Sequence, residues 1–190
     1  MANTSATGGY LSPGSPLPPE DAALDAIFQQ AIVGITGLDG TLVRPRWQAV
    51  VPQQPEPSTN WCAFGITDTG PADFPAVEHD GTGDGASALH RHEEITLLAS
   101  FYGPGASGNA KTLRDGLYLS QNREAMQAAG IDLIGADDIR AAPDLINQQW
   151  VRRFDLPLNF RRHAVRTYPV LNLLSGDAVL ETDVQISANP

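Results

Sequence analysis

Apolar residues recur every three or four positions between Leu24 and Ile32. Two prolines and two acidic residues precede this stripe at positions 18–21, and Gly34 follows it. Proline and acidic side chains favour the first turn of a helix, whereas glycine favours its end. The pattern therefore predicts one amphipathic helix that begins near residue 20 and ends near Gly34.

Two strands are predicted next, over residues 41–50 and 60–68. A proline-rich stretch at 51–57 separates them, which favours a hairpin-like connection with an irregular loop. In the second strand, successive side chains point to opposite faces. One face carries Trp61, Ala63 and Gly65, and the other carries Cys62, Phe64 and Ile66.

Residues 69–89 are rich in Gly, Pro, Asp and Ala and show no sustained periodicity. We expect them to form a long exposed loop that interacts with another molecule. A strand resumes at residues 92–102. Its continuous apolar run at 95–101 predicts a central strand that is buried on both faces.

A second helix is indicated by apolar residues at helical spacing, namely Ala106, Ala110, Leu113 and Leu117. Residues 122–129 continue as a short helical piece that ends at Gly130. Residues 131–134 then suit a short edge strand.

The segment from Trp150 to Tyr168 alternates apolar and polar residues with a period of two, which is the pattern of a strand. At full extension it would span about 60 Å, more than the diameter of a domain of this size. We therefore expect it to bend near Pro157 or to project outward onto a neighbouring subunit. A last alternating strand is predicted at residues 178–186.

These segments predict an α+β fold, with a mixed, mainly antiparallel sheet flanked by two main helices. A chain of 190 residues suits one compact domain, which we place at residues 20–186 with the exposed loop 69–89 inside it. Residues 1–19 consist mostly of Gly, Ser, Thr, Pro and Ala and are expected to form a flexible N-terminal arm. Residues 187–190 form a short C-terminal tail.

The net charge of −10 is unevenly distributed along the chain. Residues 1–89 hold ten acidic residues against Arg44 and Arg46, whereas residues 90–190 hold twelve acidic and ten basic residues. An acidic chain is unsuited to wrapping nucleic acid through phosphate contacts, although DNA can slide past an acidic wall. No apolar run approaches the roughly 18 residues of a membrane span, so no contact with a membrane is expected.

Arginines cluster in the long alternating segment, where only Asp155 opposes them: Arg152, Arg153, Arg161, Arg162 and Arg166. A guanidinium group is planar and always charged, which suits paired contacts with carboxylates. We therefore predict that this cluster is an assembly interface. It would meet the acidic first part of a neighbouring subunit in head-to-tail contacts. The alternative is an ordinary solvated strand face.

No catalytic, cofactor-binding or metal-binding residues are predicted. Cys62 is the only cysteine and lies in an apolar strand without nearby basic residues, as is typical of a buried thiol. Residues 80–85 imitate the start of a calcium loop, yet Arg91 stands where a closing Glu is needed. The best candidates for metal ligands fit no established spacing and are His79, His90, His92 and Glu93.

Several short segments of the chain, taken together and in this order, form a family pattern: residues 32–38, 43–48, 61–66, 101–103, 122–123 and 150–153. This set resembles the neck and tail terminator proteins of tailed bacteriophages, and the resemblance covers about residues 20–186. It implies a structural virion protein without enzymatic activity. Such a protein forms a ring of six copies at the neck, which caps the tail tube and joins it to the head.

The resemblance also implies the partners of the chain. They are further copies of itself, the adjoining neck and tail tube proteins, and DNA as a non-specific passenger in the lumen. The protein would be part of the virion after assembly in the host cytoplasm. Two alternatives stay open: a β-rich receptor-binding or adhesion module of a phage or bacterium, and a small metal-dependent hydrolase that uses the histidines named above.

Overall fold

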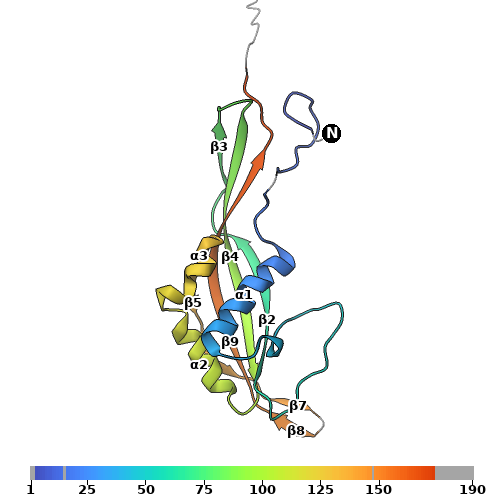
Figure 1. Ribbon diagram of the computed structural model, residues 1–190, viewed down its shortest axis with the longest axis vertical. Helices are drawn as coiled ribbons and strands as arrows, with labels where there is room; N and C mark the ends of the chain where they lie inside the picture. Colours follow the sequence, from blue (N-terminus) through green and yellow to red (C-terminus); the bar gives the residue numbers. More distant parts are fainter. Residues whose placement is uncertain (1–2, 15, 147, 174–190) are drawn as a thin grey trace, which may run out of the picture.

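The computed structural model describes residues 3–14, 16–146 and 148–173 (Figure 1). The helices are α1 (Asp21–Thr36), α2 (Ala106–Gly116) and α3 (Glu124–Ala128), with 3-10 turns at Gly40–Leu42 and Ser120–Arg123. The strands are β1 (Val43–Pro45), β2 (Trp61–Pro71), β3 (Ala76–Asp80), β4 (Ala86–Tyr102), β5 (Ile131–Ala136), β6 (Arg140–Ala141), β7 (Asp144–Ile146), β8 (Gln149–Val151) and β9 (Arg153–Tyr168).

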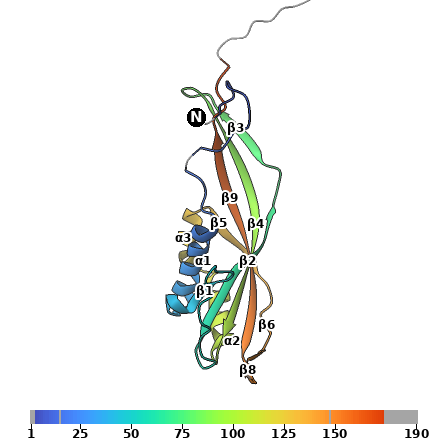
Figure 2. The ribbon, with the colours of Figure 1, turned by 90° about the vertical axis from the view of Figure 1, so that its right-hand side faces the viewer.

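A seven-stranded sheet forms the framework of the molecule. Its main path runs β1-β2-β4-β9-β5, while β3 pairs with β4 and β6 pairs with β9. All these pairs are antiparallel except β1 with β2. The helices lie together on one face of the sheet (Figure 2). The predicted α+β fold with a mainly antiparallel sheet is therefore confirmed, and β4 and β5 are the predicted central and edge strands.

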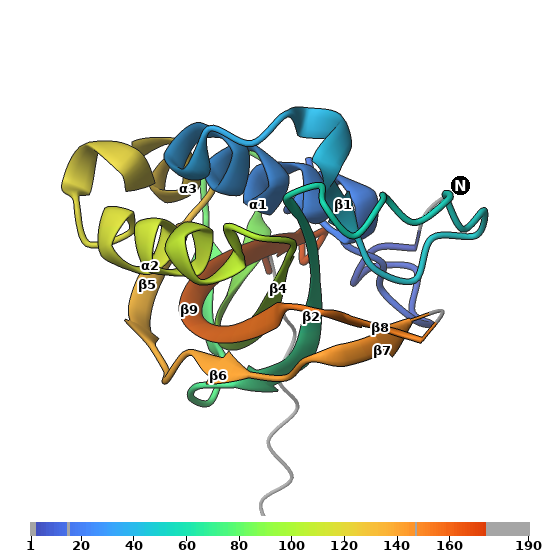
Figure 3. The same cartoon turned by 90° about the horizontal axis from the view of Figure 1, so that it is seen from below.

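The hydrophobic core lies between the helices and the sheet, which curves beneath α1 and α2 (Figure 3). The ring of Phe28 on α1 lies 5.0 Å from that of Phe160 on β9. On α2 the small buried residues Ala106 and Ala110 let the helix approach the sheet closely. Each large apolar side chain buried here contributes about 1.5–3 kcal/mol. None of the helices in the described part of the chain is long and apolar enough to cross a membrane.

The strands β4 and β9 pair along their whole length, from Ser87 opposite Tyr168 to Tyr102 opposite Arg153. The helices cover only part of this ribbon, and the rest stands out from the body together with β3 (Figures 1 and 2). We call this part, residues 76–92 and 163–168, the projection; it includes β3 and the turn that follows it. The long strand thus continues through Pro157 and projects, which was one of the two predicted outcomes.

The N-terminal arm lies along the projection. The backbone N–H of Gly14 donates to the carbonyl of Thr167 at 2.6 Å, and that of Ser5 donates to the carbonyl of Pro169 at 3.1 Å. These contacts place the described part of the arm beside the end of β9.

The predicted first helix is confirmed as α1, which ends at Thr36, two residues after Gly34. Gly37 ends it at a φ of 72° with an N–H that donates to the carbonyl of Val33. A second prediction about this part of the chain is wrong in detail. The strand predicted at 41–50 is shorter, and it is parallel to β2, so the two strands are not a hairpin. A parallel pair needs a connection of a dozen or more residues, which the segment 46–60 supplies.

Residues 69–89 are exposed for the most part, as predicted, but they do not form a continuous loop. β2 runs on to Pro71, β3 follows, and β4 begins at Ala86. Every residue of β3 is exposed, so no alternation of apolar and polar residues marks this strand in the sequence. The segment predicted at 150–168 is divided between β8 and β9. The predicted strand at 178–186 and the tail at 187–190 lie outside the described residues.

Candidate functional site

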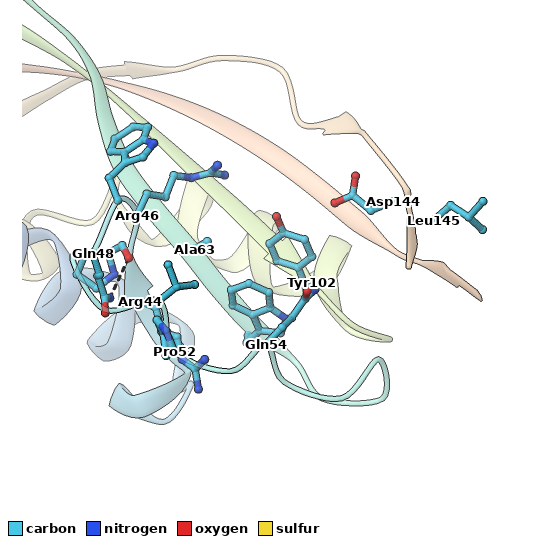
Figure 4. Close-up of a pocket in the computed structure, with 13 residues that line it drawn as sticks. Arg44, Arg46, Gln48, Pro52, Gln54, Ala63, Tyr102, Asp144 and Leu145 are labelled. Carbon is cyan, nitrogen blue, oxygen red and sulfur yellow. Dashed lines mark hydrogen bonds between the residues drawn. The ribbon is translucent and has the colours of Figure 1, made fainter. Parts of the chain in front are cut away.

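A groove of about 660 Å³ is present on the face of the sheet turned away from the helices. Figure 4 shows Asp144 and Leu145 of β7 on one side of it and Arg44 and Pro52 on the other, with Tyr102 between them. The residues that line the groove are Arg44, Pro45, Arg46, Trp47, Gln48, Val51, Pro52, Gln54, Trp61, Ala63, Tyr102, Asp144 and Leu145.

The floor of the groove is aromatic. Trp61 and Tyr102 lie opposite each other on β2 and β4, and their stacked rings have centroids 4.2 Å apart. The guanidinium carbon of Arg153 lies 5.8 Å from the centroid of the Tyr102 ring. Burial raises the pKa of the Tyr102 hydroxyl above its ordinary value. A stacked aromatic floor with a cation beside it suits an apolar or aromatic side chain from a partner.

A chain of polar contacts fixes the groove to the sheet. Arg46 donates to Ser100, which donates to Asp155. Arg153 donates to both oxygens of Asp155 at 2.8 Å and to Asp144 on β7 at 3.3 Å. The hydrogen bond to Asp155 raises the pKa of the Arg153 guanidinium. The β7 side and the floor are thereby tied together, so the groove is formed before any partner arrives.

The rim of the groove exposes several large apolar side chains. Trp47 is 73% exposed and has a φ of 58°, which is rare for a bulky residue. A Cβ atom at Gly65 would lie 2.7 Å from the Trp47 ring, so a glycine is needed beneath it. The other exposed apolar residues nearby are Val50, Val51, Leu145 and Trp150. Exposed apolar surface of this kind marks sites of protein contact.

Arg162 is the buried member of the predicted arginine interface, with only 3% of its surface exposed. It donates to Glu93 on β4 at 3.0 Å, to Glu20 at 3.1 Å and to the carbonyl of Pro19 at 2.8 Å. These bonds attach the start of α1 to the long strands at the point where the projection leaves the body. All three guanidinium nitrogens are occupied within the chain, so Arg162 has a structural role.

The other four arginines divide into paired and exposed residues. Arg153 is held by Asp155, and Arg166 donates to Glu20 at 2.8 Å. Arg161 is exposed and lies 3.7 Å from Glu94. Arg152 is exposed, and no ion pair to it is found among the described residues.

The structure does not bring the predicted metal ligands together. Glu93 faces Arg162, on the side of β4 opposite to His92. His79 lies on β3, where its ring nitrogens are 3.1 Å from Ser87 Oγ and 2.9 Å from Asn172 Oδ1. Within the described ranges, no group of three or more His, Cys, Asp or Glu residues is arranged to hold a metal ion.

His90 and His92 instead stack against His163 of β9, a residue that no sequence pattern connects with them. The ring centroids are 5.2 Å apart for His90 and His163, and 4.6 Å apart for His92 and His163. His90 Nδ1 and His163 Nε2 are 3.0 Å apart. Burial and the two neighbouring imidazoles lower the pKa of His163.

Cys62 is fully buried in β2, as predicted. Burial raises the pKa of its thiol far above the ordinary value, so the thiol stays protonated. A protonated, enclosed thiol is a poor nucleophile. Cys62 therefore serves as a packing residue.

A preformed apolar groove, an exposed aromatic rim and a projecting three-stranded ribbon define a structural protein that works through contacts with other proteins. The chain belongs to the phage neck terminator protein family, whose model matches residues 22–187. It is accordingly a structural component of the virion at the neck and tail, without enzymatic function. The predicted resemblance, virion location and non-enzymatic role are confirmed by this membership.

Among the solved structures, a chain from the virion of a native gene transfer agent particle is similar to this chain. It is 18% identical to this chain with a TM-score of 0.26, and the match covers 76% of this chain and 99% of that one. No curated protein matches the chain.

Proposed function

We propose that copies of this chain associate head to tail into a closed ring, of six copies, at the phage neck. The ring terminates the tail tube and connects it to the head, and DNA passes through its lumen as a non-specific passenger. Adjoining neck and tail tube proteins bind its two rims.

The observation that carries this proposal is that the two ends of the elongated molecule differ in charge. The projection and the turn before it expose four acidic residues, Asp73, Glu78, Asp80 and Asp84, against two half-buried arginines, Arg91 and Arg166. At the other end, Arg44 and Arg46 line the groove with only Asp144 against them, and Arg152 is exposed nearby. Surfaces of opposite charge attract and orient each other during encounter.

Two surfaces of opposite charge on the same chain favour head-to-tail assembly. When a contact joins two different patches, each copy uses one patch for the copy before it and the other for the copy after it. Such head-to-tail contacts give a ring if the rotation closes. An acidic chain with a net charge of −10 also suits a lumen past which DNA slides without being held.

Within the predicted arginine cluster, the structure favours Arg152 and Arg161 as the residues that reach a neighbouring copy. Both are exposed, and the ion pair found for Arg161 among the described residues is the one with the exposed Glu94. Arg153, Arg162 and Arg166 already bind carboxylates of their own chain. Ion pairs between these arginines and carboxylates of the neighbouring copy would determine the orientation of the two copies more than the strength of their contact.

Light scattering and negative-stain imaging test the ring, on the purified chain and on chain added to isolated tail tubes. Six copies of the 20.2 kDa chain weigh about 121 kDa. We expect rings of this mass for the wild type and weaker assembly for the double variant R152S/R161S. The matched control is K111S/R114S on α2, which removes two cations from the helix layer and should assemble normally.

A chain that stays monomeric at all concentrations, with or without tail tubes, contradicts the ring. A trimer that binds a glycan would instead indicate a receptor-binding module. Equal effects of the two double variants would show that the loss of charge, and not its position, is responsible.

A further inference from the structure

The turn between β2 and β3 exposes a phenylalanine completely. Phe74 is 99% exposed, and it stands between Asp73 and Pro75. Figure 2 shows this stretch of chain bowing outward on the side of the sheet away from the helices. Transfer of this ring from water to an apolar surface of a partner would be favourable, because the whole side chain is available for burial.

The turn is held in its outward position by the chain itself. The N–H of Ala72 donates to the carbonyl of His92 at 3.0 Å, and Arg91 donates to the carbonyl of Asp73 at 3.4 Å. The two prolines at positions 71 and 75 restrict the backbone further. The turn is thus pre-organised, which lowers the entropy lost on binding.

The groove matches this turn in size and chemistry. Its volume of about 660 Å³ lies in the range of sites that enclose apolar groups. The stacked Trp61 and Tyr102 offer an aromatic floor for a phenyl ring. Arg44 and Arg46 line the same groove, and their charge complements the carboxylate of Asp73.

We propose that Phe74 of one copy inserts into the groove of the next copy, with Asp73 directed toward Arg44 and Arg46. The occupant is a second copy because Phe74 is almost fully exposed in its own chain while the groove it would fill stays open. The inference rests on the proposed ring and names the contact between its neighbouring subunits. Aromatic anchors in preformed pockets carry most of the binding energy of such contacts.

Variants on each side of the contact test it. F74S removes the anchor, and V51D/L145D places carboxylates on the groove wall; all three side chains are exposed in the monomer, so folding is preserved. We expect each variant to associate about 30-fold more weakly or worse, as for a hot-spot residue. L119S and Y118D/L119D, on the helix side, are the matched controls and should assemble as the wild type.

Mixing the two defective chains is the sharper experiment. F74S retains an intact groove, and V51D/L145D retains an intact Phe74, so one contact between them survives. We expect an equimolar mixture to give heterodimers that grow no further, by native mass spectrometry. A mixture that stays monomeric, or variants that assemble as the wild type does, would overturn the insertion of Phe74.

Cross-linking separates this inference from the ring proposal. The buried Cys62 does not react, so D73C/Q48C, which keeps Phe74 and the aromatic floor, adds two accessible thiols that would join successive copies into a covalent ladder under oxidation. D73C/L119C is the control and should give none. Rings of normal mass without a ladder overturn the Phe74 contact alone. A ladder without rings supports the contact and rejects ring closure, and absence of both overturns both proposals.

Discussion

Arg162 illustrates how one residue can hold two parts of this fold together. It lies on β9 between Phe160 and Ala164, on the face that packs against the helices. A buried guanidinium is tolerated only if its donors are satisfied, and here Glu93, Glu20 and the Pro19 carbonyl accept from all three nitrogens. The start of α1 is attached to the sheet through this side chain and through Arg166, which also donates to Glu20.

Replacing Arg162 should therefore destabilise the chain strongly. We expect R162S to lower the free energy of unfolding by about 3–5 kcal/mol, because Glu93 is left buried without its partner. R161S, one residue away on the exposed face, should change it by less than about 0.5 kcal/mol. Urea unfolding of the two variants measures the difference, and equal transitions would contradict the structural role of Arg162.

Among the secondary-structure elements, the projection depends on strands with little apolar surface to bury. Its exposed face carries the stack of His90, His92 and His163, and Glu78 of β3 lies 3.8 Å from His90. The next pair along the ribbon is Glu94 with Arg161. Three stacked imidazoles attract one another when neutral and repel when protonated.

The stability of the chain should consequently fall in mild acid. The pKa of His163 in the folded chain lies below its ordinary value of 6.5, so the unfolded chain binds the proton more readily. The contribution of His163 is complete above pH 6.5 and is lost as the pH falls from there toward the lowered pKa. Unfolding measured from pH 8 to pH 5 should show this loss in the wild type.

The variant H163Q provides the comparison, because glutamine keeps a polar side chain but does not titrate in this range. Its stability should vary less with pH between 7 and 5 than that of the wild type. Identical pH profiles for the two chains would rule out the imidazole stack as the cause.

At the scale of the whole molecule, the separation of charge between the two ends has a kinetic consequence. The exposed charges of the projection are the acidic Glu78, Asp80 and Asp84, while the groove end carries Arg44, Arg46 and Arg152. Attraction between exposed charges accelerates encounter and is screened by salt, since the Debye length falls from about 30 Å at 0.01 M to about 3 Å at 1 M. Burial of Phe74 is not screened in this way.

Association of the wild-type chain should therefore slow as ionic strength rises, by about tenfold or more between low and high salt. Stopped-flow light scattering measures the rate. The double variant D80N/D84N, with two fewer charges on the projection, should start slower and depend less on salt. A rate that does not change with salt would show that charge does not guide the encounter of the copies.

Periodicity in the sequence alone determined the elements whose apolar side chains face one way. The stripe of α1, the buried run of β4 and the alternation in β9 each follow from side chains that must leave water on one side. The single buried cysteine and the family resemblance were also available from the residues. The helix and strand patterns could be recognised because each of them lies within one segment of the chain.

Tertiary structure decided everything that depends on residues far apart in the chain. β3 buries no side chain and thus left no pattern, and the parallel pairing of β1 depends on where a long loop returns. The arginine cluster looked like one surface, yet Glu20 lies 142 positions from Arg162 and binds it internally. The groove arises only where Trp61, Tyr102 and Leu145 meet, because strand register and not sequence distance brings side chains together.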